Sequence, residues 1–127
     1  MLILDTHAWI WYVTESENLS NNSRKAIKSA DICGVSAISC WEVAMLCKKE
    51  RIKLSMDLEN WMNLALNFPK IKLLPITPQI SIKSVQFDNL HSDPADRFII
   101  ATSFVNNSIL ITKDKKIIDS KIVKTIW

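Results

Sequence analysis

Short apolar runs alternate with helical patterns along this chain. Leu2-Ile3-Leu4 is an apolar run too short for a helix, and it predicts a buried strand that ends at Asp5. Similar short runs bounded by turn residues recur further along the chain. The predicted strands are residues 2–4, 31–36, 71–76 and 108–112, with a short fifth strand within 121–127.

The segments between these runs show helical spacing and helix-start residues. Ser20 is expected to cap a helix that runs to about residue 30, and Thr77, followed by Pro78, caps another. Ser39 and Glu42 have the spacing of a capping box, so we expect a helix to open there. The remaining predicted helices are residues 8–14, 57–67 and a long one that starts at 93–96 and runs to about 106.

Strands separated by helices are typical of a parallel sheet with helical crossovers. Right-handed crossovers place helices on both faces of such a sheet. We therefore expect an α/β fold. The 127 residues suit a single domain, residues 1–127, without repeats or a linker.

Composition narrows the class of protein. The hydrophobic content of 48% is ordinary for a globular protein, and the longest apolar runs are too short for a membrane span. We find no signal peptide, and the odd number of cysteines fits reduced thiols in the cytoplasm. A single glycine, Gly34, excludes a glycine-rich phosphate loop. The net charge of +3 permits a nucleic-acid partner.

Four acidic residues lie beside predicted strand ends or in first helical turns. They are Asp5, Glu42, Asp96 and Asp114. Three of them have an ordinary explanation when taken alone: Glu42 as a capping-box partner, Asp96 in the dipole of a helix that Asp93 caps, and Asp114 in a turn. Because ligands bind at the carboxyl edge of parallel sheets, we expect the four acids to converge there.

Gathered carboxylates repel one another unless cations enter. Oxygen ligands without cysteine favour a hard divalent ion, Mg²⁺ or Mn²⁺, and the sequence leaves open whether one or two ions bind. Such an ion activates water for hydrolysis of a phosphodiester. Nearby basic residues are candidates to hold a polyanion backbone, although each alone is an ordinary solvated charge. These are Arg97, Lys113, Lys115 and Lys116.

Four segments resemble the motifs of PIN domains, and among these the VapC-like toxins of bacterial toxin–antitoxin pairs. The motifs occur in the family's order and spacing and span residues 2 to about 118. They are Leu4-Asp5-Thr6-His7-Ala8, Ser36-Ala37-Ile38-Ser39-Cys40-Trp41-Glu42-Val43-Ala44, His91-Ser92-Asp93-Pro94-Ala95-Asp96-Arg97-Phe98-Ile99-Ile100-Ala101 and Ile111-Thr112-Lys113-Asp114.

The resemblance implies a three-layer α/β/α sandwich with strand order 3-2-1-4-5, and a Mg²⁺-dependent endoribonuclease. It also implies a homodimer that a VapB-like antitoxin inhibits. It makes the four acids the metal-binding and catalytic set, with Asp5 central and Asp93 as an auxiliary. Thr6 and Thr112 match hydroxyl residues that are expected to orient carboxylates.

One segment differs from the family pattern, and two histidines lie within the motifs. Many relatives have Lys-Gly-Arg where this chain has Lys49-Glu50-Arg51, a difference that bears on a turn and leaves the acids untouched. His7 and His91 suggest acid–base catalysis, but His7 is a common occupant of its motif position, and we expect it to be structural.

Other functions fit less well. A PIN-like module that binds RNA or protein without cutting has no need of all four acids. Haloacid-dehalogenase-like enzymes need a second acid two residues after Asp5, where His7 stands. Receiver domains need an acid after the third strand, where Pro75-Ile76-Thr77 stands. The RNA target and the identity of the antitoxin are not encoded in recognisable motifs.

Overall fold

The fold is described from a computed structural model, and the description covers residues 1–90 and 92–127. The prediction that concerns His91 lies outside these residues. No helix in the described ranges is long and apolar enough to cross a membrane.

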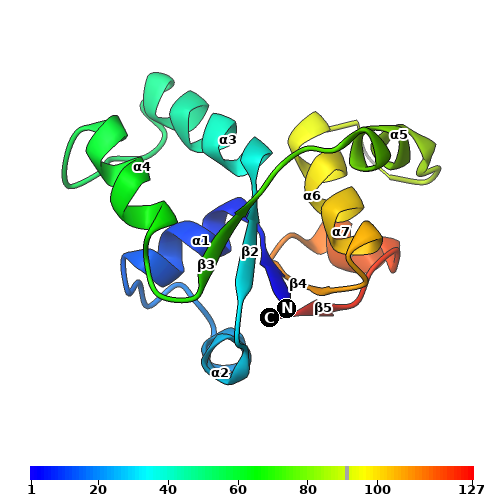
Figure 1. The fold of residues 1–127 in the computed structure, drawn as a ribbon, viewed down its shortest axis with the longest axis horizontal. Helices are drawn as coiled ribbons and strands as arrows, with labels where there is room; N and C mark the ends of the chain where they lie inside the picture. Colours follow the sequence, from blue (N-terminus) through cyan, green and yellow to red (C-terminus); the bar gives the residue numbers. More distant parts are fainter. Residues whose placement is uncertain (91) are drawn as a thin grey trace.

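The described strands form one parallel sheet in the order β3-β2-β1-β4-β5, as predicted. β1 is therefore the central strand, with β2 on one side and β4 on the other (Figure 1). The strands are β1 (Leu2–Leu4), β2 (Cys33–Ser36), β3 (Ile71–Leu74), β4 (Ile109–Ile111) and β5 (Thr125–Ile126).

Helices connect the strands and cover both faces of the sheet, which gives the expected three-layer α/β/α architecture (Figure 1). Ser20 and Thr77 cap their helices as predicted. The helices are α1 (Thr6–Val13), α2 (Asn21–Ser29), α3 (Ala37–Lys48), α4 (Leu58–Leu66), α5 (Pro78–Gln86), α6 (Pro94–Val105) and α7 (Lys115–Ser120).

Alternation of side chains along β1 produces two cores. Leu2 and Leu4 pack into a cluster with residues of α1 to α4, which includes Trp9 and Trp61. Ile3 points to the opposite face and packs into a cluster with residues of α6 and α7. Because Ile3 and Leu4 have no exposed surface, β1 is a rigid support for the residue that follows it.

One predicted helix start was wrong, and one helix was not predicted. α3 begins at Ala37 and is capped by Ser36, whose hydroxyl accepts a hydrogen bond from the backbone N–H of Ile38 at 3.2 Å. Glu42 therefore lies well inside α3, and Ser39 and Glu42 do not form a capping box. α7, a six-residue helix whose N-cap is Asp114, has no counterpart among the predicted helices.

Strand pairing sets what lies at the carboxyl edge of the sheet. Leu4 of β1 pairs with Ile111 of β4, and the N–H of Asp5 donates to the carbonyl of Ile111 at 3.0 Å. The next residues of the two segments, Asp5 and Thr112, are therefore neighbours. The fold in this way brings the first and last predicted motifs together.

Candidate active site

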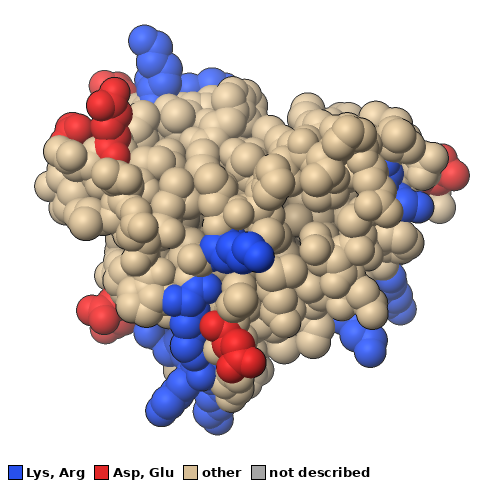
Figure 2. Space-filling model, in the orientation of Figure 1, with Lys and Arg blue, Asp and Glu red and all other residues tan. Residues whose placement is uncertain are grey.

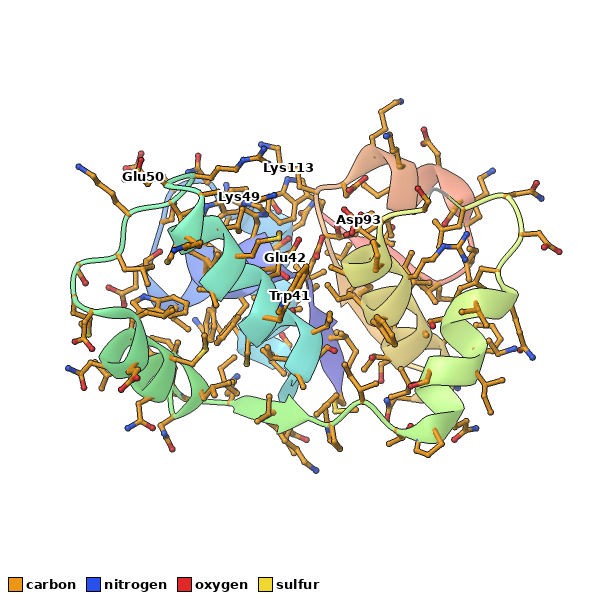
Figure 3. The ribbon with its side chains drawn as sticks, turned by 90° about the horizontal axis from the view of Figure 1, so that it is seen from above. Trp41, Glu42, Lys49, Glu50, Asp93 and Lys113 are labelled. Carbon is orange, nitrogen blue, oxygen red and sulfur yellow. The ribbon has the colours of Figure 1, made fainter. Side chains whose placement is uncertain are left out.

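A cleft of about 890 Å³ opens at the carboxyl edge of the sheet. The four predicted acids all line it, although they come from different parts of the chain. Figure 3 shows Glu42 on α3 and Asp93 at the start of α6 on opposite sides of this cleft. The acidic residues of the lining are Asp5, Glu42, Asp93, Asp96 and Asp114.

Asp5 is held by two hydrogen bonds. Its Oδ1 accepts from the backbone N–H of Thr6 at 2.8 Å, so Asp5 is the N-cap of α1. Its Oδ2 accepts from the hydroxyl of Thr112 at 2.6 Å. These two bonds fix the orientation of the carboxylate relative to the central strand.

Glu42 is oriented by the hydroxyl of Thr6, which donates to Oε1 of Glu42. The same hydroxyl oxygen lies 2.9 Å from Oγ of Ser39. A hydroxyl has only one proton, and a carboxylate can only accept, so Ser39 donates to Thr6 while Thr6 donates to Glu42. Thr6 thus contacts two of the acids, Asp5 through its backbone and Glu42 through its side chain.

The other acids lie at helix starts. Asp96 is in the first turn of α6 and is buried, with 8% of its surface exposed. Asp93 caps α6, and its Oδ1 accepts from the N–H of Ala95 at 3.0 Å. Asp114 caps α7 through its Oδ1, which accepts from the N–H of Lys116 at 2.8 Å. Asp93 and Asp114 therefore have structural roles in addition to any chemical one.

Burial and mutual repulsion disfavour the charged forms of these acids. Burial, together with the charges of Asp5, Asp93, Asp114 and Glu42, raises the pKa of Asp96 to about 8. Burial also raises the pKa of Asp5, against the lowering effect of its bonds from Thr112 and Thr6. The pKa of Glu42 is raised by burial, and the bond from Thr6 opposes this. A cation in the cleft would relieve the repulsion.

The donor set in the cleft fits a hard divalent cation, because it consists mainly of carboxylate oxygens. Among the described residues, however, no three His, Cys, Asp or Glu side chains already form a group that could hold one metal ion. The hydrogen bonds explain part of this arrangement: Glu42 is directed to Thr6, and Asp5 to Thr112.

The basic candidates divide into two groups. Lys113, Lys115 and Lys116 are exposed and line the cleft. Arg97 does not line it. Its guanidinium donates to the carbonyls of three residues at the end of α5 and in the loop that follows, at 2.8–3.1 Å. This position does not support our prediction that Arg97 binds a polyanion backbone. The hydrogen bonds of Arg97 instead connect α6 to the end of α5 and its following loop.

An aromatic wall of the cleft was missed by the sequence analysis. Trp11 and His7, both on α1, line the cleft, and their ring centroids lie 5.4 Å apart. His7 is exposed on this wall, so it is not part of the core. The spacing of His7, Ala8 and Trp11 on one helix face is the signal that predicts such a wall once Asp5 is placed at the start of α1.

Comparisons with known proteins show the family and support the fold. A family model of the PIN domain matches residues 2–121. The chain is 33% identical over 117 residues to Ribonuclease VapC22 of Mycobacterium tuberculosis, a match that covers 91% of this chain and 88% of that protein.

Solved structures share the fold at low identity. One is a toxin–antitoxin complex from Klebsiella pneumoniae, with a TM-score of 0.71, 19% identity, and coverage of 100% of this chain and 97% of that one. Another is VapC20 of Mycobacterium tuberculosis, with a TM-score of 0.70, 11% identity, and coverage of 98% of both chains. The four motifs, the strand order and the family match together show that this chain is a VapC-like member of the PIN-domain family.

Proposed function

We propose that this protein is a Mg²⁺-dependent endoribonuclease that acts as the toxin of a toxin–antitoxin pair in the cytoplasm. The observation that carries the proposal is the cleft, where acids from separate elements meet at the end of the central strand. Packing does not explain this arrangement, because burial and repulsion raise the pKa values of Asp5, Glu42 and Asp96.

The relatives support the same chemistry. VapC22, which is 33% identical over most of the chain, is a ribonuclease by name. VapC20, a structural neighbour, is described as a toxin that cleaves the sarcin–ricin loop. We propose RNA hydrolysis for this chain, with a target that its own surface determines.

We propose that Asp5 and Asp96 are the main ligands of Mg²⁺ (Mn²⁺ as a substitute), with Glu42 and Asp114 completing the site for one or two ions. Mg²⁺ binds proteins through one or two carboxylates and keeps several waters, so a preformed group of three acids is not required. When bound, the ion lowers the pKa of a water molecule and offsets the charge of the phosphate.

The remaining residues of the site orient the carboxylates or bind the phosphates of the RNA. Thr112 holds the Asp5 carboxylate, and Thr6 holds that of Glu42. Asp93 starts α6 and so positions Asp96. The exposed Lys113, Lys115 and Lys116 flank Asp114 in the lining of the cleft, and they bind backbone phosphates beside the scissile bond.

For partners, we propose a VapB-like antitoxin and a second copy of this chain. The neighbour from Klebsiella pneumoniae is a toxin–antitoxin complex, which supports the first. Supporting the second, Figure 2 shows an area with few charged side chains over α5 and α6, although a basic side chain lies over β3. Leu73, Ile82 and Val85 are 46%, 58% and 77% exposed, and such apolar surface marks interaction sites.

The test is cleavage of RNA by the purified chain in Mg²⁺, with excess EDTA and with Asp5→Asn as the two comparisons. We expect cleavage only by the parent chain in Mg²⁺, with Asp5→Asn inactive while its circular dichroism spectrum is unchanged. Full activity in EDTA, or in Asp5→Asn, would contradict the proposal.

A second candidate is a non-cutting PIN-like module that binds RNA or protein. The absence of a ready three-residue metal group among the described residues favours it. RNA binding without metal uptake or turnover in the same assay would establish this alternative.

A further inference from the structure

Trp11 packs against the core on one side and lines the acidic cleft on the other. Trp9, two positions earlier on α1, has no exposed surface, whereas Trp11 is only half-buried and lines the cleft. Ala8, which is buried, lines the cleft beside it. α1 therefore buries Trp9 fully in the core, whereas Trp11 packs against the core and is partly exposed at the cleft.

Neighbouring rings hold Trp11 in place. Its ring centroid lies 5.7 Å from that of Trp127 at an interplanar angle of 54°, and 5.4 Å from that of His7 at 51°. Tilted aromatic pairs at such distances are favourable. Trp11 is thus a braced, partly exposed aromatic surface that faces the same space as the acids.

The ammonium group of Lys113 lies next to the Trp11 ring. Nζ of Lys113 lies 5.4 Å from the centroid of the Trp11 ring, within the range of a cation–π contact. Lys113 is exposed and also lines the cleft, and in Figure 3 its side chain extends on the cleft side of the molecule. An aromatic platform with an adjacent exposed lysine matches one nucleotide unit, because bases stack on aromatic rings and phosphates pair with cations.

We propose that Trp11 stacks on a nucleobase of the substrate while Lys113 pairs with a neighbouring phosphate. This inference rests on the proposed function only in assigning RNA to the cleft. Bases in a helical duplex are stacked on one another and are not offered to an aromatic side chain, whereas single-stranded loops can splay a base outward. Stacking on Trp11 therefore requires one unpaired base beside the scissile phosphate.

The experiment measures binding, so it does not depend on cleavage. Fluorescein-labelled oligouridine of about eight nucleotides, a length within single-strand site sizes, is titrated with the Asp5→Asn protein and followed by anisotropy. A sugar–phosphate oligomer of the same length without bases, and an RNA duplex, serve as comparison probes. The variants Trp11→Leu and Trp11→Phe are made in this background.

Loss of stacking on a base is expected to weaken oligouridine binding by about 5-fold to 150-fold in Trp11→Leu. Trp11→Phe should keep most of the affinity, which guards against a loss of folding as the cause. The base-free oligomer should bind Trp11→Leu and the parent equally, and the duplex should bind more weakly than oligouridine. Trp41→Leu is the matched control, because Trp41 is 53% exposed but does not line the cleft.

Equal losses for the oligomers with and without bases, or no loss for either in Trp11→Leu, would overturn the proposal. An equal loss in Trp41→Leu would also overturn the assignment to Trp11. The two proposals can fail separately. If the parent chain cleaves RNA and Trp11→Leu binds oligouridine as well as the parent, only the stacking inference is wrong. If binding depends on the bases but the parent chain does not cleave RNA, only the proposed nuclease activity is wrong.

Discussion

Thr112 Oγ1 donates a 2.6 Å hydrogen bond to Oδ2 of Asp5, across 107 positions of the chain. The bond follows from the pairing of β1 with β4, which places the residues after Leu4 and Ile111 side by side. Thr112 Oγ1 also accepts from the N–H of Asp114 at 3.1 Å. One buried hydroxyl thus connects the first and last acids of the site.

Thr112→Val should remove this connection. We expect a loss of about 10-fold to 100-fold in Mg²⁺ affinity or activity, as for other groups that orient metal ligands. The free energy of unfolding should also fall by about 1–3 kcal/mol, because a buried acceptor loses its partner. Cleavage assays and urea denaturation measure the two effects.

Thr112→Ser is the control, since it keeps the hydroxyl and removes only a methyl group. It should retain most of the activity. If Val and Ser variants were equally active, the bond to Asp5 would have no role in the site.

Thr6 offers a second test, because its hydroxyl binds Glu42 while its backbone binds Asp5. Thr6→Val should leave the Asp5 contact in place and release the Glu42 side chain. We expect activity to fall by about 10-fold or more, with Thr6→Ser close to the parent. A Thr6→Val protein with the activity and Mg²⁺ dependence of the parent would show that the orientation of Glu42 is unimportant.

Asp96 should make the metal-free protein less stable as the pH rises. Its pKa is about 8 in the folded chain, against an ordinary value of 3.8, so between these values the folded state keeps a proton that the unfolded state has lost. The contribution of Asp96 to stability therefore falls as the pH rises through this window and is constant above it.

Thermal melting in EDTA at several pH values tests this expectation. Asp96→Asn should flatten the decline in melting temperature between about pH 4 and pH 8, because its amide does not titrate. Mg²⁺ should stabilise the parent chain most at the upper end of the range, where the carboxylates are charged. Identical pH profiles for the parent and Asp96→Asn would contradict the raised pKa.

Substitution of Arg97 should reduce stability, whereas substitution of Lys113 should affect RNA binding. Arg97→Met removes three hydrogen bonds from a guanidinium to carbonyls, so we expect unfolding to become easier by about 1.5–3 kcal/mol. Lys113→Gln should leave stability unchanged and reduce the salt dependence of single-stranded RNA binding by about 0.7 in slope. A stable Arg97→Met protein with weakened RNA binding would restore Arg97 as a phosphate contact.

The strands and helix caps that support the site could be predicted from the sequence, because they depend on local patterns. A three-residue apolar run ending in Asp5 has few options other than a buried strand, and parallel pairing then places the other acids at the same edge. Ser20 and Thr77 were identified as helix caps because capping is a local interaction.

What the sequence did not predict depends on contacts between distant residues or on very short elements. Ser36 and Ser39 are both possible caps for α3, and the contact of Ser39 with Thr6, which favours Ser36, appears only in the folded chain. α7 is too short to show helical periodicity. The role of Arg97 depends on the packing of α5 against α6. The position of Trp11 at the cleft depends on which face of α1 packs against the core.

The central claim is that the carboxylates of the cleft bind a divalent cation. The most direct measurement is anomalous diffraction from crystals soaked in Mn²⁺, for the parent chain and for Asp5→Asn. We predict a Mn²⁺ peak in contact with Asp5 and Asp96 in the parent, which is lost or strongly reduced in Asp5→Asn. A cleft without Mn²⁺ at millimolar concentration, or a peak of equal height in Asp5→Asn, would contradict the claim.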